Sequence, residues 1–205
     1  ESEDSLELLR RYIKKHNVQA VFWNRRYEPQ LIKRDVKIKK QLTQLGCTVE
    51  SFKASVLNEP WEILKANGTP YMVYTAYWKR FVTVPLDRYK TFSKIPSLPK
   101  GLNIAKNQIN TLKLNPQSRW DLKLYQDWNP GAKSAQKILK NFLQNKIQDY
   151  QKNRDIPGVL GTSRLSPHLH FGEISSVEIF EAIEKKFGPL AAIKNLGVIQ
   201  FCKEN

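Results

Sequence analysis

The sequence predicts a parallel α/β region followed by an all-helical region, with a long connecting segment between them. Three observations support this prediction. Helical and strand patterns alternate over the first third of the chain, proline and glycine interrupt the periodicity over residues 83–119, and only helical patterns follow. Alternating helices and strands are typical of a parallel sheet with right-handed crossovers. The expected boundaries are 1–82 for the α/β part, 83–131 for the linker and 132–205 for the helical part.

The α/β part begins with an amphipathic helix. Asp4 or Ser5 can accept the free backbone N–H groups of its first turn. Apolar residues then recur on one helical face, namely Leu6, Leu9 and Ile13. Residues 18–23 are rich in β-branched and aromatic side chains and therefore predict a buried strand.

A second helix and strand follow a polar loop at residues 24–30. The apolar positions of this helix are Val36, Ile38, Leu42 and Leu45. Gly46 ends it, because glycine adopts the left-handed cap without steric cost. Residues 48–52 predict the second strand, and Pro60 suits the start of a further helix that ends at Gly68. Two strands are too few for a whole parallel sheet, so more strands are expected before residue 1.

The helical part contains three predicted helices. Helical spacing of apolar residues predicts the first over residues 132–150. A loop with proline and glycine leads to a short helix at 163–171, which Gly172 ends. A third helix covers 176–187, where Ser175 and Glu178 have the spacing of a capping box.

Composition excludes several classes of protein. The 205 residues are 40% hydrophobic, which is too apolar for a disordered chain. No apolar run approaches the ~18 residues of a membrane-spanning helix, so no membrane partner is expected. Cys47 and Cys202 lie far apart, which excludes a disulfide scaffold and a cysteine-rich zinc site. We therefore expect no metal, and a reducing compartment such as the bacterial cytoplasm.

Most of the net charge of +15 lies in one stretch. Residues 79–146 contain 14 Lys and Arg, three Asp and no Glu, which gives this stretch a charge of +11. Such charge attracts nucleic acid by releasing counterions. Because these cations form no ordered stripe, a solvated surface explains them as well. A basic nucleic-acid-binding module without a cofactor therefore stays open as one interpretation.

Four motifs resemble the DNA photolyase and cryptochrome family. They are residues 23–29 (Trp-Asn-Arg-Arg-Tyr-Glu-Pro) with Arg34-Asp35 behind them, residues 68–78, residues 128–132 (Trp-Asn-Pro-Gly-Ala) and residues 150–175, which contain Gly-Thr-Ser-Arg-Leu-Ser-Pro. They occur in the family's order and at its spacing over almost the whole chain. Ala76 and Ala132 depart from the proline and glutamate that the family usually has there.

The resemblance implies a Rossmann-like antenna domain at 1–82 and the first helices of an FAD-binding helical domain at 132–205. It implies a deoxyribodipyrimidine photo-lyase, an enzyme that repairs pyrimidine dimers in DNA by light-driven electron transfer from reduced FAD. A cryptochrome-type blue-light photoreceptor is the alternative. The parent protein is expected to be monomeric. The resemblance places the catalytic residues beyond Asn205, and the absence of an initiating Met agrees with a chain truncated at both ends.

The same resemblance implies a set of cofactor-binding residues, which are Tyr150, Thr162, Ser163, Arg164, Leu165 and Ser166. Hydroxyl groups can donate to the phosphates of FAD, Arg164 adds a full positive charge, and a helix N-terminus adds a partial one. Without the resemblance, the residues favour a simpler interpretation, in which Thr162 or Ser163 caps a helix.

Two further sites are implied by the resemblance. Arg154 is expected to bind a DNA phosphate, since a guanidinium can pair with phosphate bidentately; the alternative is a surface pair with Asp155 of little energetic consequence. An antenna chromophore, methenyltetrahydrofolate or a deazaflavin, is expected in the α/β part. Gln30 and Leu31 replace the polar pair that helps to bind folate in some members. All five tryptophans are expected to pack in the core.

Overall fold

The computed structural model describes residues 4–53, 56–83, 118, 120, 122–123 and 128–204. The chain divides into two compact units, residues 1–84 and 85–205. The predicted linker at 83–131 lies mostly outside the described residues, so its boundaries stay a prediction. None of the described helices is long and apolar enough to cross a membrane.

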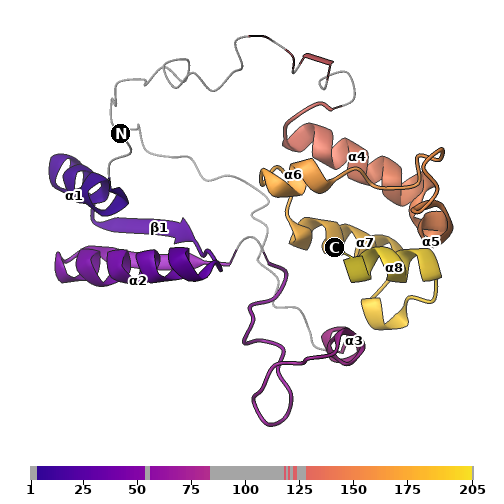
Figure 1. Cartoon of the computed structure of the whole chain (residues 1–205), viewed down its shortest axis with the longest axis horizontal. Helices are drawn as coiled ribbons and strands as arrows, with labels where there is room; N and C mark the ends of the chain where they lie inside the picture. The colour runs from indigo at the N-terminus through magenta and orange to yellow at the C-terminus, as the bar shows by residue number, and fades with distance from the viewer. Residues whose placement is uncertain are drawn as a thin grey trace. The chain divides into compact units, whose positions relative to one another are not determined.

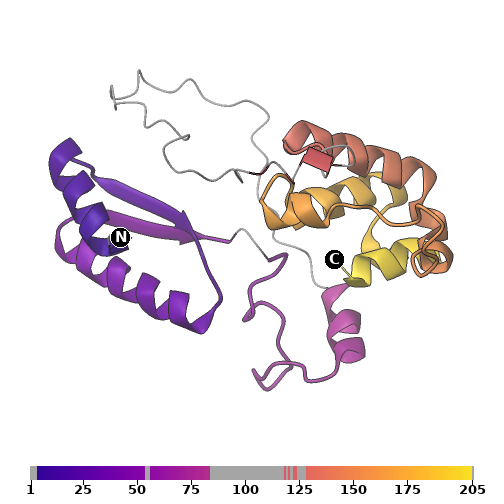
Figure 2. The same ribbon diagram turned by 45° about the horizontal axis from the view of Figure 1, so that its top comes forward.

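The first unit is built on two parallel strands. Its elements are α1 (Ser5–His16), β1 (Ala20–Asn24), α2 (Pro29–Gln44), β2 (Thr48–Phe52) and α3 (Tyr74–Phe81) (Figure 1). Ala20 pairs with Thr48 and Asn24 with Phe52, and α2 connects the two strands. Figure 2 shows the strands side by side with α1 and α2 along them. The parallel α/β prediction is confirmed.

One face of this sheet carries the core of the unit. The core residues are Leu6, Ile38, Leu42, Cys47 and Val49, with Leu9, Ile13, Val21 and Trp23 packed against them. Both α1 and α2 contribute to this cluster, so both cover the same face. On the other face, Phe22 and Phe52 are 59% and 43% exposed, with ring centroids 6.1 Å apart. The sheet is therefore covered on one side by the helices and open on the other.

Local signals determine the ends of the first two helices. The Asp4 carboxylate accepts the Leu6 N–H at 3.0 Å and caps α1. Pro29 begins α2, and Gly46 follows it with φ +80°, as predicted. The apolar pattern of α2 predicted a wider buried face than the structure has. Val36 and Leu45, which belong to that pattern, are 63% and 56% exposed.

The helix predicted at residues 60–68 is wrong, because these residues form turns. The Glu59 N–H donates to the side chain of Glu62 at 2.7 Å, and Lys65 closes a turn with Thr69 and Gly68. Such local hydrogen bonds compete with helical ones. The helix α3 lies further along, where ring contacts join Tyr77 and Trp78 to Phe81.

The second unit is helical, as predicted. Its elements are α4 (Ala132–Asn145), the 3₁₀ turn η3 (Ile147–Asp149), α5 (Tyr150–Asn153), α6 (Ser166–His170), α7 (Ser176–Phe187), the 3₁₀ turn η4 (Leu190–Ala192) and α8 (Leu196–Glu204) (Figure 1). Its most deeply buried side chains are Phe142, Ile147, Leu165, His168, Ile179, Phe180, Ile183, Val198 and Phe201. The capping box of Ser175 and Glu178 is present at the start of α7.

The helix predicted over 132–150 is interrupted after Asn145. The interruption coincides with a close approach of α8, because a Cβ at Gly197 would lie only 2.5 Å from the carbonyl oxygen of Ile147. Glycine at this position lets α8 pack directly on the backbone of η3. A continuous helix was predicted because the sequence pattern does not show this long-range contact.

Candidate functional site

The first candidate site is the segment between α5 and α6, where the sequence predicted cofactor-binding residues. Gly161 fixes its beginning, since a Cβ there would lie 2.5 Å from the Cβ of Asn153. Leu165 fixes its end, because its side chain is 1% exposed. Thr162 is exposed and Ser163 and Arg164 are half-buried, so the segment presents these three residues between two anchored points.

The interpretation of Thr162 or Ser163 as a helix cap is wrong. The predicted helix start at residue 163 moves to Ser166, and Leu165 occupies the N-cap position without a side-chain cap. The Ser163 hydroxyl instead accepts the Leu165 N–H at 3.3 Å. With only five residues, α6 also has a weak helix dipole. An anion bound here would therefore rely mainly on the hydroxyls of the segment and the Arg164 guanidinium.

Arg164 has an unusual conformation and a defined aromatic partner. Its φ of +58° lies in the left-handed region that favours glycine. Its guanidinium carbon lies 4.6 Å from the centroid of the Trp128 ring, which is within the range of a cation–π interaction.

A buried histidine–glutamate pair supports the tryptophan. The Trp128 ring lies 6.2 Å from that of His168, which is 2% exposed and whose Nδ1 lies 2.5 Å from Oε2 of Glu173. The Gly131 N–H and then His168 lower the pKa of Glu173, since both stabilise its carboxylate. This cluster connects α6 to the residues that precede α4.

Tyr150 and Arg154, the other two predicted contacts, both meet Glu204 of α8. The Tyr150 hydroxyl donates to Oε2 of Glu204 at 2.7 Å, and its ring packs edge-on against Phe142 and Phe201. Arg154 forms an ion pair with Glu204 and another with Asp155 at 3.2 Å. The alternative pairing of Arg154 with Asp155 is thus present. A phosphate would have to compete with two carboxylates for this guanidinium.

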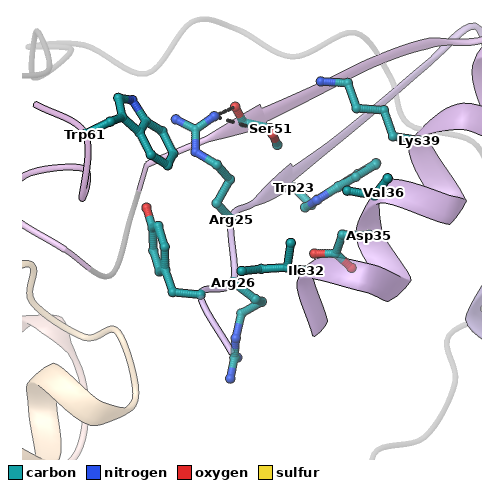
Figure 3. A pocket seen from close by; sticks show the side chains of 10 residues that line it. Trp23, Arg25, Arg26, Ile32, Asp35, Val36, Lys39, Ser51 and Trp61 are labelled. Atoms are coloured by element: carbon teal, nitrogen blue, oxygen red, sulfur yellow. Dashed lines mark hydrogen bonds between the residues drawn. The ribbon is translucent and has the colours of Figure 1, made fainter. Parts of the chain in front are cut away.

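The second candidate site is a pocket of about 270 Å³ in the first unit. The residues that line it are Trp23, Arg25, Arg26, Tyr27, Ile32, Asp35, Val36, Lys39, Ser51 and Trp61. It lies where β1 ends, which is where parallel α/β sheets commonly bind ligands. Figure 3 shows the Arg25 guanidinium directed toward Ser51, with the Trp61 ring beside it.

A buried glutamate organises one wall of this pocket. Glu59 is 4% exposed, and its carboxylate accepts from Arg25 at 2.6–2.8 Å and from the Tyr27 hydroxyl at 2.8 Å. Burial, followed by the hydrogen bond to Glu59, raises the pKa of Tyr27 to about 12. Tyr27 is therefore a neutral donor at any physiological pH.

The pocket combines aromatic walls with an excess of positive charge. Arg25 is balanced by Glu59, and Arg26 pairs with Glu28 at 2.6 Å, which lowers the pKa of Glu28 to about 2. Lys39 also lines the pocket, and Asp35, the acidic residue of the lining, pairs with Arg34 at 2.7 Å. Such a lining suits a planar, anionic ligand.

Sequence reasoning missed this pocket. It assigned all five tryptophans to the core. Trp23 does pack against the core, but Trp61 and Trp120 are 59% and 67% exposed, which contradicts the assignment for these two. Trp23 and Trp61 both line the pocket. The polar run after the first strand could have indicated the site, because ligands bind at the carboxyl ends of parallel strands. Nothing in the sequence indicated that Trp61 and Glu59 belong to this site. The sequence predicted a helix from residue 60 onward, and this helix does not form. Among the described residues, no cluster of three or more His, Cys, Asp or Glu side chains could hold a metal.

The fold and these sites define a class: an α/β unit joined to a helical unit, with a candidate cofactor site in each. Comparison with known proteins gives the family. The DNA photolyase family model matches residues 1–99. The chain is 33% identical to a deoxyribodipyrimidine photo-lyase of Agrobacterium fabrum, over 88% of this chain and 38% of the relative. It is 32% identical to cryptochrome-1 of Arabidopsis thaliana, over 90% of this chain and 27% of the relative.

Solved structures agree with this assignment. A class III photolyase from Agrobacterium tumefaciens superposes with a TM-score of 0.84 at 31% identity, covering 99% of this chain and 42% of that one. A cryptochrome from Synechocystis shares the fold, with a TM-score of 0.73 at 18% identity. The chain belongs to the DNA photolyase and cryptochrome family. It spans well under half the length of these relatives.

Proposed function

We propose that the whole protein is a deoxyribodipyrimidine photo-lyase, and that this chain supplies its phosphate-binding segment for FAD. The observation that carries the proposal is the anchored segment after Gly161, which presents hydroxyls and a guanidinium side by side in a member of this family. When bound and reduced, FAD supplies the photoexcited electron that splits a pyrimidine dimer.

The donor set of this segment fits a dinucleotide diphosphate. The hydroxyls of Thr162, Ser163 and Ser166 can each donate one hydrogen bond, and Arg164 can donate two in parallel. Leu165 contributes through burial, because its anchored side chain fixes the backbone between the donors. Tyr150 is the predicted contact for the rest of the cofactor, and its hydroxyl is oriented by Glu204.

Arg154 is proposed as a DNA-backbone contact. It lies in the loop that precedes the phosphate-binding segment and is about one-third exposed. Binding a phosphate there exchanges two carboxylate partners for one phosphate, so the contact contributes less than that of an unpaired arginine. A phosphate contact carries no sequence information, and Arg154→Ala should therefore weaken binding to damaged and undamaged duplex alike.

The pocket at the end of β1 is proposed as the antenna-chromophore site. A folate or deazaflavin ring can lie against its tryptophans, and Lys39 can meet an anionic group. Gln30 and Leu31, which replace the family's folate pair, do not line this pocket.

Cofactor retention tests the proposal. In the whole protein, Arg164→Ala should weaken FAD binding more than Ser163→Ala, because a charged donor contributes about 1.5–3 kcal/mol and a neutral one about 1. Flavin absorbance after gel filtration measures this. Thr43→Ala is a matched control, since Thr43 is an exposed hydroxyl residue in the other unit. Unchanged flavin in both variants would remove the basis of the assignment.

A cryptochrome photoreceptor is the second candidate, favoured by the 32% identity to cryptochrome-1 of Arabidopsis thaliana. Repair of dimer-containing DNA under blue light separates the two functions. A photolyase restores the DNA, whereas a photoreceptor holds flavin and leaves the dimer intact. A protein that binds DNA but holds no flavin would instead be the basic nucleic-acid-binding module.

A further inference from the structure

The backbone of Arg164 is held in a conformation that arginine rarely adopts. Among the described residues, the other positive-φ positions are glycines and Asn17, the types that tolerate the left-handed region best. Arg164 has φ +58° although a Cβ makes that conformation costly. The structure around Arg164 must offset this cost.

The Trp128 ring is the partner that the structure shows. The guanidinium lies 4.6 Å from the ring centroid, and the ring itself rests against the buried His168. His168 is held by Glu173, which also accepts the Gly131 N–H three residues after the tryptophan. The ring is thereby supported both along the chain and from α6.

The contact with the ring leaves donors of Arg164 available. A guanidinium carries five N–H donors, which is more than one aromatic ring can occupy. An arginine held against a ring has also already lost much of its rotational freedom, which lowers the entropy cost of binding a phosphate.

We propose that Trp128 is a positioning residue for the FAD diphosphate: its ring holds Arg164 ready, and so sets FAD affinity without contacting the cofactor. This inference rests on the proposed function, because it takes Arg164 to be a phosphate donor. The tryptophan acts only through the arginine. Removing the arginine must therefore remove the effect of the tryptophan.

A double-mutant cycle in the whole protein tests this inference. FAD dissociation constants are measured by adding FAD to the apoprotein. Trp128→Leu should weaken binding by about 2- to 30-fold, the range that a cation–π contact supplies. In the Arg164→Ala background the same change should have no further effect. Trp128→Phe keeps an aromatic face and should retain most of the affinity, whereas Trp120→Leu, a change at a residue that is 67% exposed, should alter nothing.

Two further variants separate positioning from simple stability. Arg164→Gly relieves the strained backbone, so the apoprotein should unfold no more easily than the unchanged protein, while FAD binding weakens as it does in Arg164→Ala. If Trp128→Leu fails to fold, Trp128→Phe and Trp128→His complete the cycle, with Phe retaining more affinity than His.

The outcomes distinguish this inference from the proposed function. Equal losses from Trp128→Leu in both backgrounds would overturn the positioning role. If Arg164→Ala weakens FAD binding and Trp128→Leu does not, the inference fails and the phosphate assignment stands. If Arg164→Ala itself has no effect, the phosphate assignment fails and the inference fails with it.

Discussion

The two units bury their cores differently. The helical unit surrounds side chains such as Phe142, Phe180 and Phe201 on every side, leaving at most 2% of each exposed. The α/β unit packs two helices on one face of its sheet and leaves Phe22 and Phe52 open on the other. The two candidate sites therefore have different kinds of support. The segment proposed to bind phosphate is anchored by a closed core, whereas the wall of the pocket depends on one buried glutamate.

The largest expected difference between the units is in the unfolding free energy that is lost when a phenylalanine is truncated to alanine. Phe142→Ala in the helical unit should cost about 3–5 kcal/mol of unfolding free energy, because the side chain is 1% exposed and contacts Phe201 and Tyr150. Phe22→Ala in the α/β unit should cost less than about 1 kcal/mol. Hydrogen exchange resolved by unit measures both. Similar costs would show that the open sheet face is covered in solution.

Substitution of Glu59 should destabilise the wall of the pocket. Glu59→Gln should destabilise the α/β unit by about 1.5–3 kcal/mol, because Arg25 and Tyr27 lose a charged acceptor. The pKa of Tyr27 should fall from about 12 toward its ordinary value, although burial keeps part of the rise.

This pKa has a defined consequence at high pH. A raised pKa gives a stabilisation that is complete below the ordinary value near 10 and is lost as the pH rises through about 12. Absorbance titration of tyrosinate checks the shift. A titration that is the same in Glu59→Gln and in the unchanged protein would contradict the role of Glu59.

Each unit contains one free, buried cysteine that reports how often that unit opens. Burial, with a smaller effect from Glu184, raises the pKa of Cys202 to about 12, so its thiol stays unreactive until the helical unit opens. We expect a thiol reagent at pH 8 to modify Cys47 several-fold faster than Cys202, because the α/β core is smaller. Cys47→Ser and Cys202→Ser assign the two phases. Faster modification of Cys202 would show instead that the helical unit is the less stable of the two.

The smallest expected effect is that of Glu173 on the stability of the helical unit at low pH. The Gly131 N–H and His168 lower its pKa, so the stabilisation is present above the ordinary value of 4.5 and is lost as the pH falls through the lower value of the folded protein. Glu173→Gln should flatten the acid limb of the helical unit's stability curve and leave that of the α/β unit unchanged. Unfolding curves between pH 3 and 7 check this, and an unaltered acid limb would contradict it.

Features set by neighbouring residues were predictable from the sequence. The Asp4 cap, the end of α2 at Gly46 and the capping box at Ser175 each depend on residues a few positions apart, and all three are present. The segment proposed to bind phosphate was predicted from its resemblance to a family, and its role stays a prediction.

Long-range contacts were not predictable in this way. Arg25 and Glu59 are 34 positions apart in the sequence, and the cation–π pair of Trp128 and Arg164 is separated by a similar number of positions. Gly197 lies against the backbone of η3, about fifty residues earlier in the chain. No local pattern shows such pairs, because each depends on how elements far apart in the sequence pack.

The two units are proposed to hold separate cofactors at separate sites, and absorption spectra of the purified whole protein can decide this. Arg164→Ala and Lys39→Ala are the paired variants, one for each site. We predict that Arg164→Ala loses flavin absorbance and keeps that of the antenna chromophore, whereas Lys39→Ala does the reverse. Loss of both chromophores in either variant, or of the flavin in Lys39→Ala, would contradict the separation of the two sites.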